Sequence, residues 1–358
     1  MDNSETKKPW IETPLIWSRT LSKAAGCNVF LKLENTQPSG AFKSRGIGHY
    51  MQQRLPKSNS QANGHTESVT STHFFCSSGG NAGLACVHAA ATLGCPSTIV
   101  VPMTTNAYMI GKLRDAGAKE VIQIGASWFE ADQHLVNELL PKAKTSGESA
   151  VYVPPFDHPD IWTGNATMVE EIVKQLPVAE RSYPVKPTSA SSKETAPDAI
   201  VCSVGGGGLF CGVMQGLSTC APTSKTKVLA VETVGADSLA QAVQKRELVT
   251  LPAITSIATT LGARTVARQA FAYASKSEKV CTAVLTDAEA VDACLRFADD
   301  ERMLVEPSCG VSLAACYTGK VKQYLPDLNV DSRVVIVVCG GSNASLQGLA
   351  DYKRQFSD

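Results

Sequence analysis

The stretch AIVCSVGGGGLFCGVMQGL, residues 199–217, carries the pattern that decides the fold. It opens on a short apolar run with β-branched residues, passes through four consecutive glycines at 205–208, and continues as an apolar run of helical length. A run that is apolar on both faces is typical of a parallel strand covered by helices. The stretch therefore predicts a strand, a tight turn and a helix, the unit from which α/β proteins are built.

The same pattern recurs on both sides of this stretch, so the whole chain is predicted to be α/β. Predicted strands cover residues 29–33, 73–77, 98–101, 120–124, 199–204, 228–231 and 334–338. Predicted helices cover residues 82–93, 106–116 and 208–217, and Thr286 with Glu289 predicts a capping box that opens a further helix. Two polar stretches without apolar periodicity, 56–72 and 181–197, are predicted to be surface loops.

The composition limits the classes of protein and partner. At 358 residues with 44% hydrophobic content, the chain is long enough for one large domain or two ordinary ones. Lysine and arginine (33) balance aspartate and glutamate (33), so nucleic acid is not an expected partner. The twelve cysteines include no C-x-x-C pair, which favours reduced, buried thiols. Without a signal-like amino terminus or a membrane-length apolar run, the sequence predicts a soluble cytoplasmic protein.

Lys43 is the first candidate for covalent chemistry. It lies in the octapeptide SGAFKSRG, residues 39–46, soon after the predicted strand at 29–33. Its small neighbours leave the amine able to reach a bound aldehyde, and imine chemistry needs an amine that can also act as a base when it is neutral. On this octapeptide alone, a solvated lysine beside a turn is an equally good interpretation.

Two turns between a predicted strand and a predicted helix are candidates for anion binding. In CSSGGNAG, residues 76–83, small residues at a helix start leave backbone N–H groups unpaired, and Asn81 adds a side-chain donor suited to a carboxylate. The glycines at 205–208 let the backbone wrap a phosphate, and their spacing fits neither a P-loop nor G-x-G-x-x-G. Taken singly, a capped turn and a flexible linker explain the two stretches as well.

The last predicted strand leads into VCGGSN, residues 338–343. Taken alone, Cys339 is best explained as a small buried residue, but its thiol would also be a neutral partner for a ring nitrogen. Together, Lys43, the two turns and Cys339 would contact the aldehyde, the phosphate and the ring nitrogen of one cofactor and the carboxylate of its bound substrate. From about Thr13 to the Gly340–Gly341 region, the order and spacing of these motifs resemble the serine/threonine dehydratase family, L-serine ammonia-lyases of the fold type II pyridoxal-phosphate enzymes.

The resemblance implies a fold like that of the tryptophan synthase β subunit, with two open, parallel-rich α/β domains and the cofactor between them. Residues 1–44 and 159–358 would form the large catalytic domain that binds the cofactor, and residues 45–158 would form a small α/β domain inserted in it. The resemblance also implies pyridoxal 5'-phosphate as the cofactor, a small-molecule amino-acid substrate and, by analogy alone, a homodimer.

The resemblance makes Lys43 the catalytic residue, which would hold the cofactor aldehyde and, once the substrate amine displaces it, take the α-proton. Phe42 would stack on the pyridine ring, and Cys339 would meet the ring nitrogen. This uncharged partner makes the ring a weaker electron sink, which suits β-elimination better than transamination. The other implied contacts are those of the phosphate with Gly205, Gly206, Gly207, Gly208 and Leu209, of the ring 3-oxygen with Asn81, and of the substrate carboxylate with Ser78, Gly79 and Asn81.

Relatives in the family also bind a monovalent cation beside the phosphate turn, which implies K⁺ here. Oxygen ligands suit such a hard cation, although Glu232 is equally explained as a surface charge in a turn. The matching oxygens are the side chains of Glu232 and Ser238 and the carbonyls of Gly205, Ala236, Leu261 and Ala263.

The chain departs from the family pattern at three places. Serine racemases of the group carry serine where this chain has Gly79, so racemisation is expected to be weak or absent. Relatives often have His or Gln at the position of Asn165, which leaves the pocket near it undefined. The sequence ends soon after Asn343, so the regulatory domain of biosynthetic threonine deaminases and feedback inhibition by isoleucine are not expected.

The resemblance predicts elimination from L-serine to pyruvate and ammonia, and from L-threonine to 2-oxobutanoate and ammonia. A β-replacement enzyme of the cysteine synthase or cystathionine synthase type is an alternative, although such enzymes usually show Ser-x-Lys-Asp-Arg where this chain has FKSRG at 42–46. A nucleotide-binding dehydrogenase would explain the glycine turn, with Glu232 as its acidic residue, but leaves Lys43 unexplained. A non-catalytic binding protein also stays open.

Overall fold

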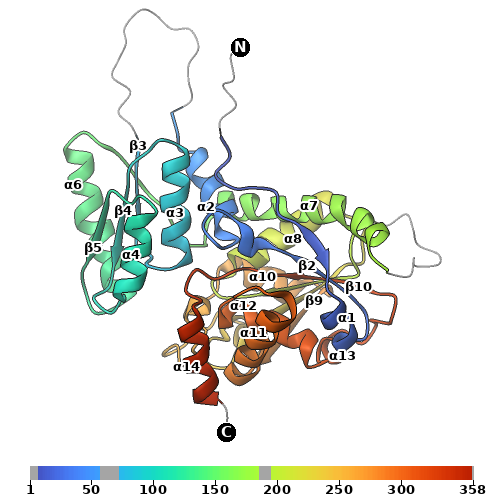
Figure 1. The fold of residues 1–358 in the computed structure, drawn as a ribbon. Coiled ribbons are helices and arrows are strands. Elements are labelled where there is room, and N and C mark those ends of the chain that lie inside the picture. Colours follow the sequence, from blue (N-terminus) through green and yellow to red (C-terminus); the bar gives the residue numbers. More distant parts are fainter. Residues whose placement is uncertain (1–6, 57–71, 185–194, 357–358) are drawn as a thin grey trace, which may run out of the picture. The chain divides into compact units, whose positions relative to one another are not determined.

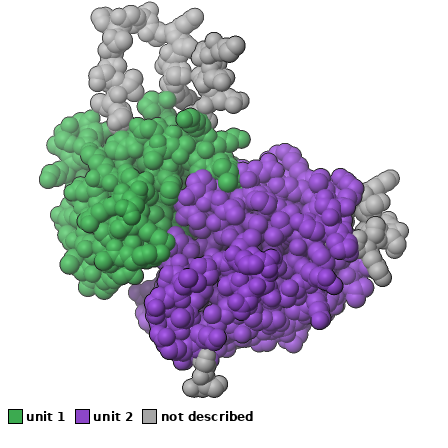
Figure 2. Space-filling model, in the orientation of Figure 1, with its two compact units in different colours: residues 1–11, 43–164 green, residues 12–42, 165–358 purple. Residues whose placement is uncertain are grey.

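The computed structural model describes residues 7–56, 72–184 and 195–356 of the chain. The chain divides into two compact units (Figure 2). The first unit comprises Met1–Ile11 with Lys43–Gly164, and the second comprises Glu12–Phe42 with Asn165–Asp358. Compared with the predicted domains, the segment that ends at Ile11 therefore groups with the smaller unit.

The reason for this difference is a close contact of the amino-terminal segment with the smaller unit. A Cβ added at Gly48 would lie 3.0 Å from the Cβ of Pro9 and 3.2 Å from the ring of Trp10. Glycine at position 48 thus lets this segment pack directly on the helix that begins at Lys43. Nothing in the spacing of the sequence predicts this contact.

The first unit is a parallel sheet with helices on both faces (Figure 1). Its strand order is β5-β4-β3-β6, and every neighbouring pair is parallel. The strands are β3 (Thr72–Cys76), β4 (Ser97–Val101), β5 (Glu120–Gln123) and β6 (Ser149–Tyr152). The helices are α2 (Lys43–Gln52), α3 (Asn81–Thr92), α4 (Ala107–Asp115), α5 (Trp128–His134), the π-helical η2 (Leu135–Leu139) and α6 (Leu140–Thr145).

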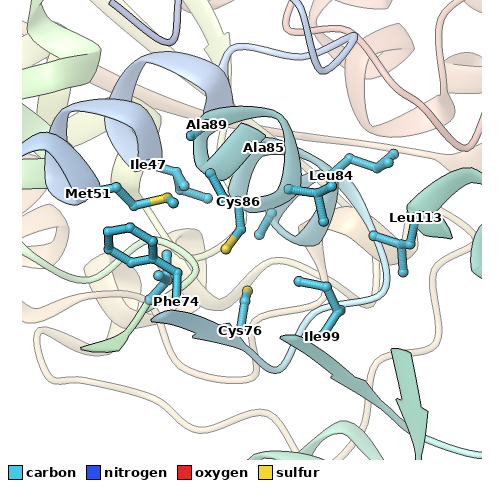
Figure 3. Packing of buried hydrophobic residues seen from close by; sticks show 14 of the residues in the cluster. Ile47, Met51, Phe74, Cys76, Leu84, Ala85, Cys86, Ala89, Ile99 and Leu113 are labelled. Carbon is cyan, nitrogen blue, oxygen red and sulfur yellow. The ribbon is translucent and has the colours of Figure 1, made fainter. Parts of the chain in front are cut away.

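Two apolar clusters fill the space between this sheet and its helices. In the larger cluster, Ile47 of α2 packs with Phe74 of β3 and with the apolar face of α3 (Figure 3). The next residue, Phe75, belongs to the cluster on the opposite face, with Leu135 of η2. Successive strand residues point to opposite faces, so a sheet covered on both sides needs strands that are apolar throughout, as β3 is.

The second unit is built on a six-stranded sheet of order β1-β2-β10-β7-β8-β9, parallel except for the edge pair β1–β2. The strands are β1 (Leu15–Trp17), β2 (Asn28–Lys32), β7 (Ala199–Ser203), β8 (Lys227–Thr233), β9 (Val280–Leu285) and β10 (Arg333–Val337). The helices, including α7, which starts in the first unit, are α1 (Arg19–Ala25), η1 (Glu34–Thr36), α7 (Pro159–Ser182), α8 (Gly208–Cys220), α9 (Ser238–Lys245), η3 (Thr259–Leu261), α10 (Arg268–Lys276), α11 (Asp287–Glu301), α12 (Pro307–Tyr317), α13 (Val321–Tyr324) and α14 (Leu346–Phe356).

The predicted α/β class is confirmed, and each predicted strand and helix begins within one residue of its observed start. The predicted capping box is also confirmed, because Thr286 and Glu289 each accept a hydrogen bond from the other's backbone N–H. Arg181 and Ser182, predicted to lie in a loop, instead end α7, whose apolar face stays buried as far as Ala179. The greater part of both predicted loops, residues 57–71 and 185–194, lies outside the described residues.

Both sheets reverse their order beside a central strand. In the first unit the chain proceeds from β3 through β4 to β5 and returns with β6 on the other side of β3. In the second unit it proceeds from β7 through β8 to β9 and returns with β10 on the other side of β7. Ligands of open α/β sheets bind outside the carboxyl ends of the strands at such switch points. No helix in the described ranges has the length and apolar character needed to cross a membrane.

Candidate active site

Lys43 stands at the carboxyl edge of the first unit's sheet. It is the first residue of α2, and its Nζ donates a hydrogen bond to the carbonyl oxygen of Pro155 at 2.8 Å. Pro155 follows shortly after β6, the strand that returns beside β3. The amine is therefore beside the switch point of this sheet. The sequence related Lys43 only to the strand before it, which is β2 of the second unit.

The turn Ser78–Asn81 stands at the same switch point, between β3 and α3. Gly80 caps α3 without a side-chain hydrogen bond, and Asn81, the first helical residue, is buried. A Cβ added at Gly83 would lie 1.9 Å from the carbonyl oxygen of Ser78, so the turn folds onto the helix at a distance that only glycine allows. In the core, Cys76 of β3 and Cys86 of α3 point toward one another (Figure 3).

Three side chains that the sequence did not single out meet directly before this turn. Ser77 Oγ donates to Asp132 Oδ1 at 2.5 Å, and Tyr152 Oη donates to the same oxygen at 2.8 Å. Burial and the hydrogen bond to Asp132 raise the pKa of Tyr152, so its hydroxyl remains a donor. Ser77 and Tyr152 could have been selected from the sequence, because both are polar residues at the ends of adjacent strands. Asp132 lies on α5, and nothing in its local sequence marks it as part of this cluster.

The glycine turn of the second unit follows β7 and opens α8. Gly207 has a φ of +91°, and a Cβ there would lie 2.6 Å from the Cβ of Ala270. A Cβ at Gly205 would lie 2.8 Å from the Cα of Leu261. Glycine is therefore required at both positions, because its missing side chain permits the backbone conformation and the close approach.

In this turn the backbone carbonyls accept hydrogen bonds, whereas the backbone N–H groups are left available for a ligand. The N–H groups of residues 205–210 find no acceptor within the described part of the chain. The carbonyls are bound: Gly206 O by Ala267 N at 3.0 Å, Gly207 O by Cys211 N at 2.8 Å and Gly208 O by Asn165 Nδ2 at 3.0 Å. Because α8 begins at Gly208, its first N–H groups and the positive end of its dipole face one place. A phosphate fits this arrangement.

Asn165 contacts the turn directly. It is only 1% exposed on α7, and its Nδ2 fixes the carbonyl of Gly208, while its Oδ1 has no partner among the residues described. The sequence identified position 165 as a departure from relatives. It did not predict the contact with Gly208, because 43 positions separate the two residues. The structure thus makes Asn165 part of the frame of the glycine turn.

Cys339 lies next to the end of β7, as the strand order requires. Its Sγ is 3.5 Å from Ser203 Oγ. A hydrogen bond with the thiol of Cys309, together with burial, raises the pKa of Cys339 well above its ordinary value, so this thiol stays neutral. The N–H of Phe42, the residue directly before Lys43, donates to the Cys339 carbonyl at 3.0 Å, so the two backbones are joined here.

Glu232 is a buried carboxylate and not a surface charge. It lies in β8 with no exposed surface, and both oxygens accept backbone hydrogen bonds from α9: Oε1 from Leu239 at 2.9 Å and Oε2 from Ala240 at 2.7 Å. Burial raises the pKa of Glu232 to about 8. A cation beside this group would offset the cost of its buried charge.

The other predicted cation ligands are partly gathered around Glu232. Ser238 is buried and is the first residue of α9, and Ala236 pairs with Thr233 at the end of β8. The carbonyl of Leu261, which lies against Gly205, accepts a hydrogen bond from Ala263 N at 2.8 Å and keeps one lone pair. No group of three or more His, Cys, Asp and Glu residues in the described ranges could hold a metal ion.

Comparisons with known proteins identify the family. Residues 7–340 match the model of the family described as pyridoxal-phosphate dependent enzyme, so the chain belongs to that family. It is 40% identical to an L-serine dehydratase/L-threonine deaminase of Bos taurus, over 96% of this chain and 95% of the relative. It is 39% identical to an L-serine dehydratase of Saccharomyces cerevisiae, over 92% and 93% of the two chains. The solved fungal L-serine ammonia-lyase from Rhizomucor miehei is 35% identical, with a TM-score of 0.82 over 98% of this chain and 100% of that one.

Family membership has two consequences for the sequence-based hypotheses. The predicted fold class, that of fold type II pyridoxal-phosphate enzymes, is confirmed, and the protein is an enzyme of that class. The dehydrogenase interpretation of the glycine turn is wrong. Glu232, the acidic residue it required, is bound to the backbone of α9 instead.

Proposed function

We propose that this chain converts L-serine to pyruvate and ammonia, and L-threonine to 2-oxobutanoate and ammonia. The observation that carries the proposal is the similarity, over nearly the whole chain, to relatives named L-serine dehydratase and L-threonine deaminase. The geometry supports it, because an amine, two turns suited to anions and a neutral thiol lie at the carboxyl ends of sheet strands.

Lys43 is proposed to be the catalytic residue. Bound pyridoxal phosphate supplies an aldehyde that captures amines and a ring that accepts electron density from Cα. Lys43 would hold that aldehyde at rest and, after the substrate amine displaces it, would take the proton from Cα through its neutral Nζ. One of its hydrogen-bond partners, the Pro155 carbonyl, carries no charge. In the net reaction the Cα–H, Cα–N and Cβ–O bonds of serine break. The hydroxyl leaves as water, Cβ gains a proton, and a water supplies the 2-oxo oxygen as ammonia is released.

The glycine turn, Gly205, Gly206, Gly207, Gly208 and Leu209, is proposed to hold the cofactor phosphate. Two features support this assignment: the N–H groups without an acceptor in the described residues, and the tight packing of Gly205 and Gly207. Backbone donors fixed in this way bind a phosphate without reorganisation. The enzyme would thereby keep the ring in one orientation through successive turnovers.

The turn Ser78–Asn81 is proposed to hold the substrate carboxylate through Ser78, Gly79 and Asn81. The N–H groups at the start of α3 are suited to an anion, and the dipole of this 12-residue helix adds positive potential. Asn81 would also contact the ring 3-oxygen. A carboxylate fixed in this way orients the α-hydrogen toward the base, which is the part of catalysis that positioning supplies.

The ring itself is proposed to lie against Phe42, with its nitrogen facing Cys339. A thiol with a raised pKa cannot protonate a pyridine nitrogen, so the ring stays a moderate electron sink. That property favours elimination over transamination. It does not separate elimination from β-replacement, which is why the product must be analysed with and without an added thiol.

We also propose K⁺ as a second cofactor, bound by the side chains of Glu232 and Ser238 and the carbonyls of Gly205, Ala236, Leu261 and Ala263. The buried carboxylate of Glu232 supports a cation there, and the contact of Gly205 with Leu261 would link that cation to the phosphate turn. The protein is further proposed to act as a homodimer in the cytoplasm. Light scattering of the purified protein tests the dimer.

The test of the main proposal is borohydride reduction of the holoenzyme followed by peptide mapping. The reduced cofactor should be attached to Lys43, and L-serine should yield pyruvate and ammonia in equal amounts. Lys43→Ala should lose both the label and the activity, while Lys142→Ala, an exposed lysine of α6, should keep them. A label on another lysine would overturn the assignment, and cysteine formed with sulfide at the expense of pyruvate would favour β-replacement.

A further inference from the structure

Asp132 occupies a position from which it can control the turn Ser78–Asn81. Ser77, the residue between β3 and this turn, is 1% exposed, and its hydroxyl donates to Asp132 Oδ1 at 2.5 Å. A hydrogen bond to a carboxylate is shorter and about twice as strong as one between neutral groups. The base of the turn is therefore fixed by a charged group on a separate helix, α5.

Asp132 also holds the strand on the other side of the switch point. Tyr152, the last residue of β6, donates to the same Oδ1 at 2.8 Å, and its neighbour across the ladder is Phe75 of β3. The carbonyl of Tyr152 in turn accepts from Tyr50 Oη at 2.8 Å. One carboxylate oxygen thus joins the carboxyl ends of β3 and β6, the two strands between which the first unit's ligand is expected.

We propose that Asp132 is a positioning residue for the substrate carboxylate. It holds the hydroxyl of Ser77 and so sets the direction of the N–H groups in the turn Ser78–Asn81. The inference rests on the proposed function, because it assigns this turn to the α-carboxylate of the amino-acid substrate. Asp132 itself does not touch the substrate. Its effect should therefore appear in the binding of the carboxylate and leave the binding of the cofactor unchanged.

The test uses the holoenzyme and two amino compounds without a β-leaving group, L-alanine and L-alaninamide, which differ in the carboxylate alone. Their binding is followed by the absorbance change of the bound cofactor. Asp132→Asn should weaken L-alanine binding by about tenfold, the loss expected for one charged hydrogen bond, and should leave L-alaninamide within about twofold. For L-serine, KM should rise by a similar factor while kcat changes little. Asp115→Asn, on the exposed end of α4, is the control and should behave as the wild type.

A second pair of variants separates positioning from general support of the fold. Ser77→Ala should weaken L-alanine binding at least as much as Asp132→Asn does, and the double variant should bind L-alanine no more weakly than Ser77→Ala, because both substitutions act on the same hydrogen bond. If Asp132→Asn fails to fold, Tyr152→Phe takes its place. This variant removes one hydrogen bond to Asp132. It should weaken the binding of L-alanine by about threefold without affecting the binding of L-alaninamide.

The outcomes divide cleanly between the two proposals. If Asp132→Asn weakened the binding of L-alanine and L-alaninamide equally, the inference would be overturned, since a purely structural role would affect the binding of both compounds. Unchanged L-alanine binding in Asp132→Asn or, where that variant does not fold, in Tyr152→Phe would overturn it as well. Both results leave the proposed function intact if the wild type still produces pyruvate and carries its cofactor on Lys43. A wild type that does neither would instead overturn the proposed function.

Discussion

The two turns that follow β3 and β7 share a plan but are held in different ways. Each follows a buried central strand, stands at the switch point of its sheet and opens a helix. The turn Ser78–Asn81 is held by the side-chain carboxylate of Asp132, which accepts hydrogen bonds from the hydroxyl groups of Ser77 and Tyr152. The glycine turn is held mainly by backbone packing, so close that no Cβ fits at Gly205 or Gly207, and by the amide of Asn165, which donates to the Gly208 carbonyl. Substitutions can therefore weaken the side-chain hydrogen bonds at the first turn stepwise, whereas a substitution at a glycine of the second turn displaces its backbone.

This difference matches the ligands proposed for the two turns. A substrate enters and its product leaves at every turnover, so binding the ground state more tightly does not raise kcat. A cofactor stays bound, so rigid donors that need no reordering are an advantage there. The two turns also differ in what surrounds them, since Asp132 is half-buried and Glu232 is fully buried. If each turn serves one ligand, a substitution at one turn should leave the ligand of the other turn bound as before.

Gly207→Ala should have the largest effect, because it displaces the closely packed backbone. A methyl group there meets Ala270 at 2.6 Å and forces a side chain onto a φ of +91°. Strain and overlap of about 3 kcal/mol should weaken cofactor binding by roughly 100-fold, measured by titrating the apoprotein with pyridoxal phosphate. Gly94→Ala is the matched control, since Gly94 has a φ of +68° but nothing within 4 Å. Similar losses in both variants would contradict the assignment of the phosphate.

The carboxylate near the glycine turn should make stability depend on pH and on K⁺. The folded pKa of Glu232, about 8, lies above the unfolded value near 4.3. Between these values the folded state binds more protons than the unfolded state, so the free energy of unfolding should fall as pH rises through this window, by about 1–3 kcal/mol. Thermal unfolding in a tetramethylammonium buffer should reveal this fall.

K⁺ should reduce the fall, because a bound cation stabilises the ionised carboxylate in the folded state. Glu232→Gln should abolish both the fall and the response to K⁺. Asp132→Asn, which alters the carboxylate of the other turn, should leave the K⁺ response unchanged. A K⁺ effect that persists in Glu232→Gln would place the cation elsewhere and remove this contrast between the turns.

The sequence was sufficient for the parts of the site that depend on local pattern. The strands β3 and β7 are apolar throughout because helices cover both faces of their sheets, and such runs are visible in one sequence. The glycines at 205 and 207 were informative for the same reason, since backbone shape and close packing exclude other residues there. Lys43 was singled out by its small neighbours and by its place shortly after a strand.

Contacts between distant side chains could not be predicted. Asp132 lies 55 positions from Ser77, and Asn165 lies 43 positions from Gly208, so no periodicity links either pair. The end of α7 was misjudged because Arg181 and Ser182 have the composition of the polar stretch that follows them. The burial of Glu232 was also hidden, since one acidic residue after an apolar strand has the same spacing whether it faces solvent or caps the next helix.

Asn165→Asp tests the side-chain hydrogen bond that Asn165 makes to the glycine turn. The variant keeps the shape of Asn165 but replaces the donor that binds Gly208 O with an acceptor, which would also repel a phosphate nearby. Cofactor binding should weaken by about tenfold, less than in Gly207→Ala because the backbone packing remains. L-alanine affinity of the fully loaded enzyme should stay unchanged. A loss confined to L-alanine would mean that this turn serves the substrate and would reverse the comparison.

Cys339→Ser should have the smallest effect, since it exchanges one neutral group for another beside Ser203. A serine hydroxyl does not ionise near neutral pH, and the Cys339 thiol, with its raised pKa, does not either. The rate of pyruvate formation from L-serine should therefore change by no more than about threefold, the size of one weak hydrogen bond. Cys339→Asp is the informative partner, because a carboxylate would stabilise the protonated form of the ring nitrogen and should raise transamination at the expense of elimination. If Cys339→Ser alone abolished pyruvate formation, the thiol would be doing chemistry that a neutral contact cannot supply.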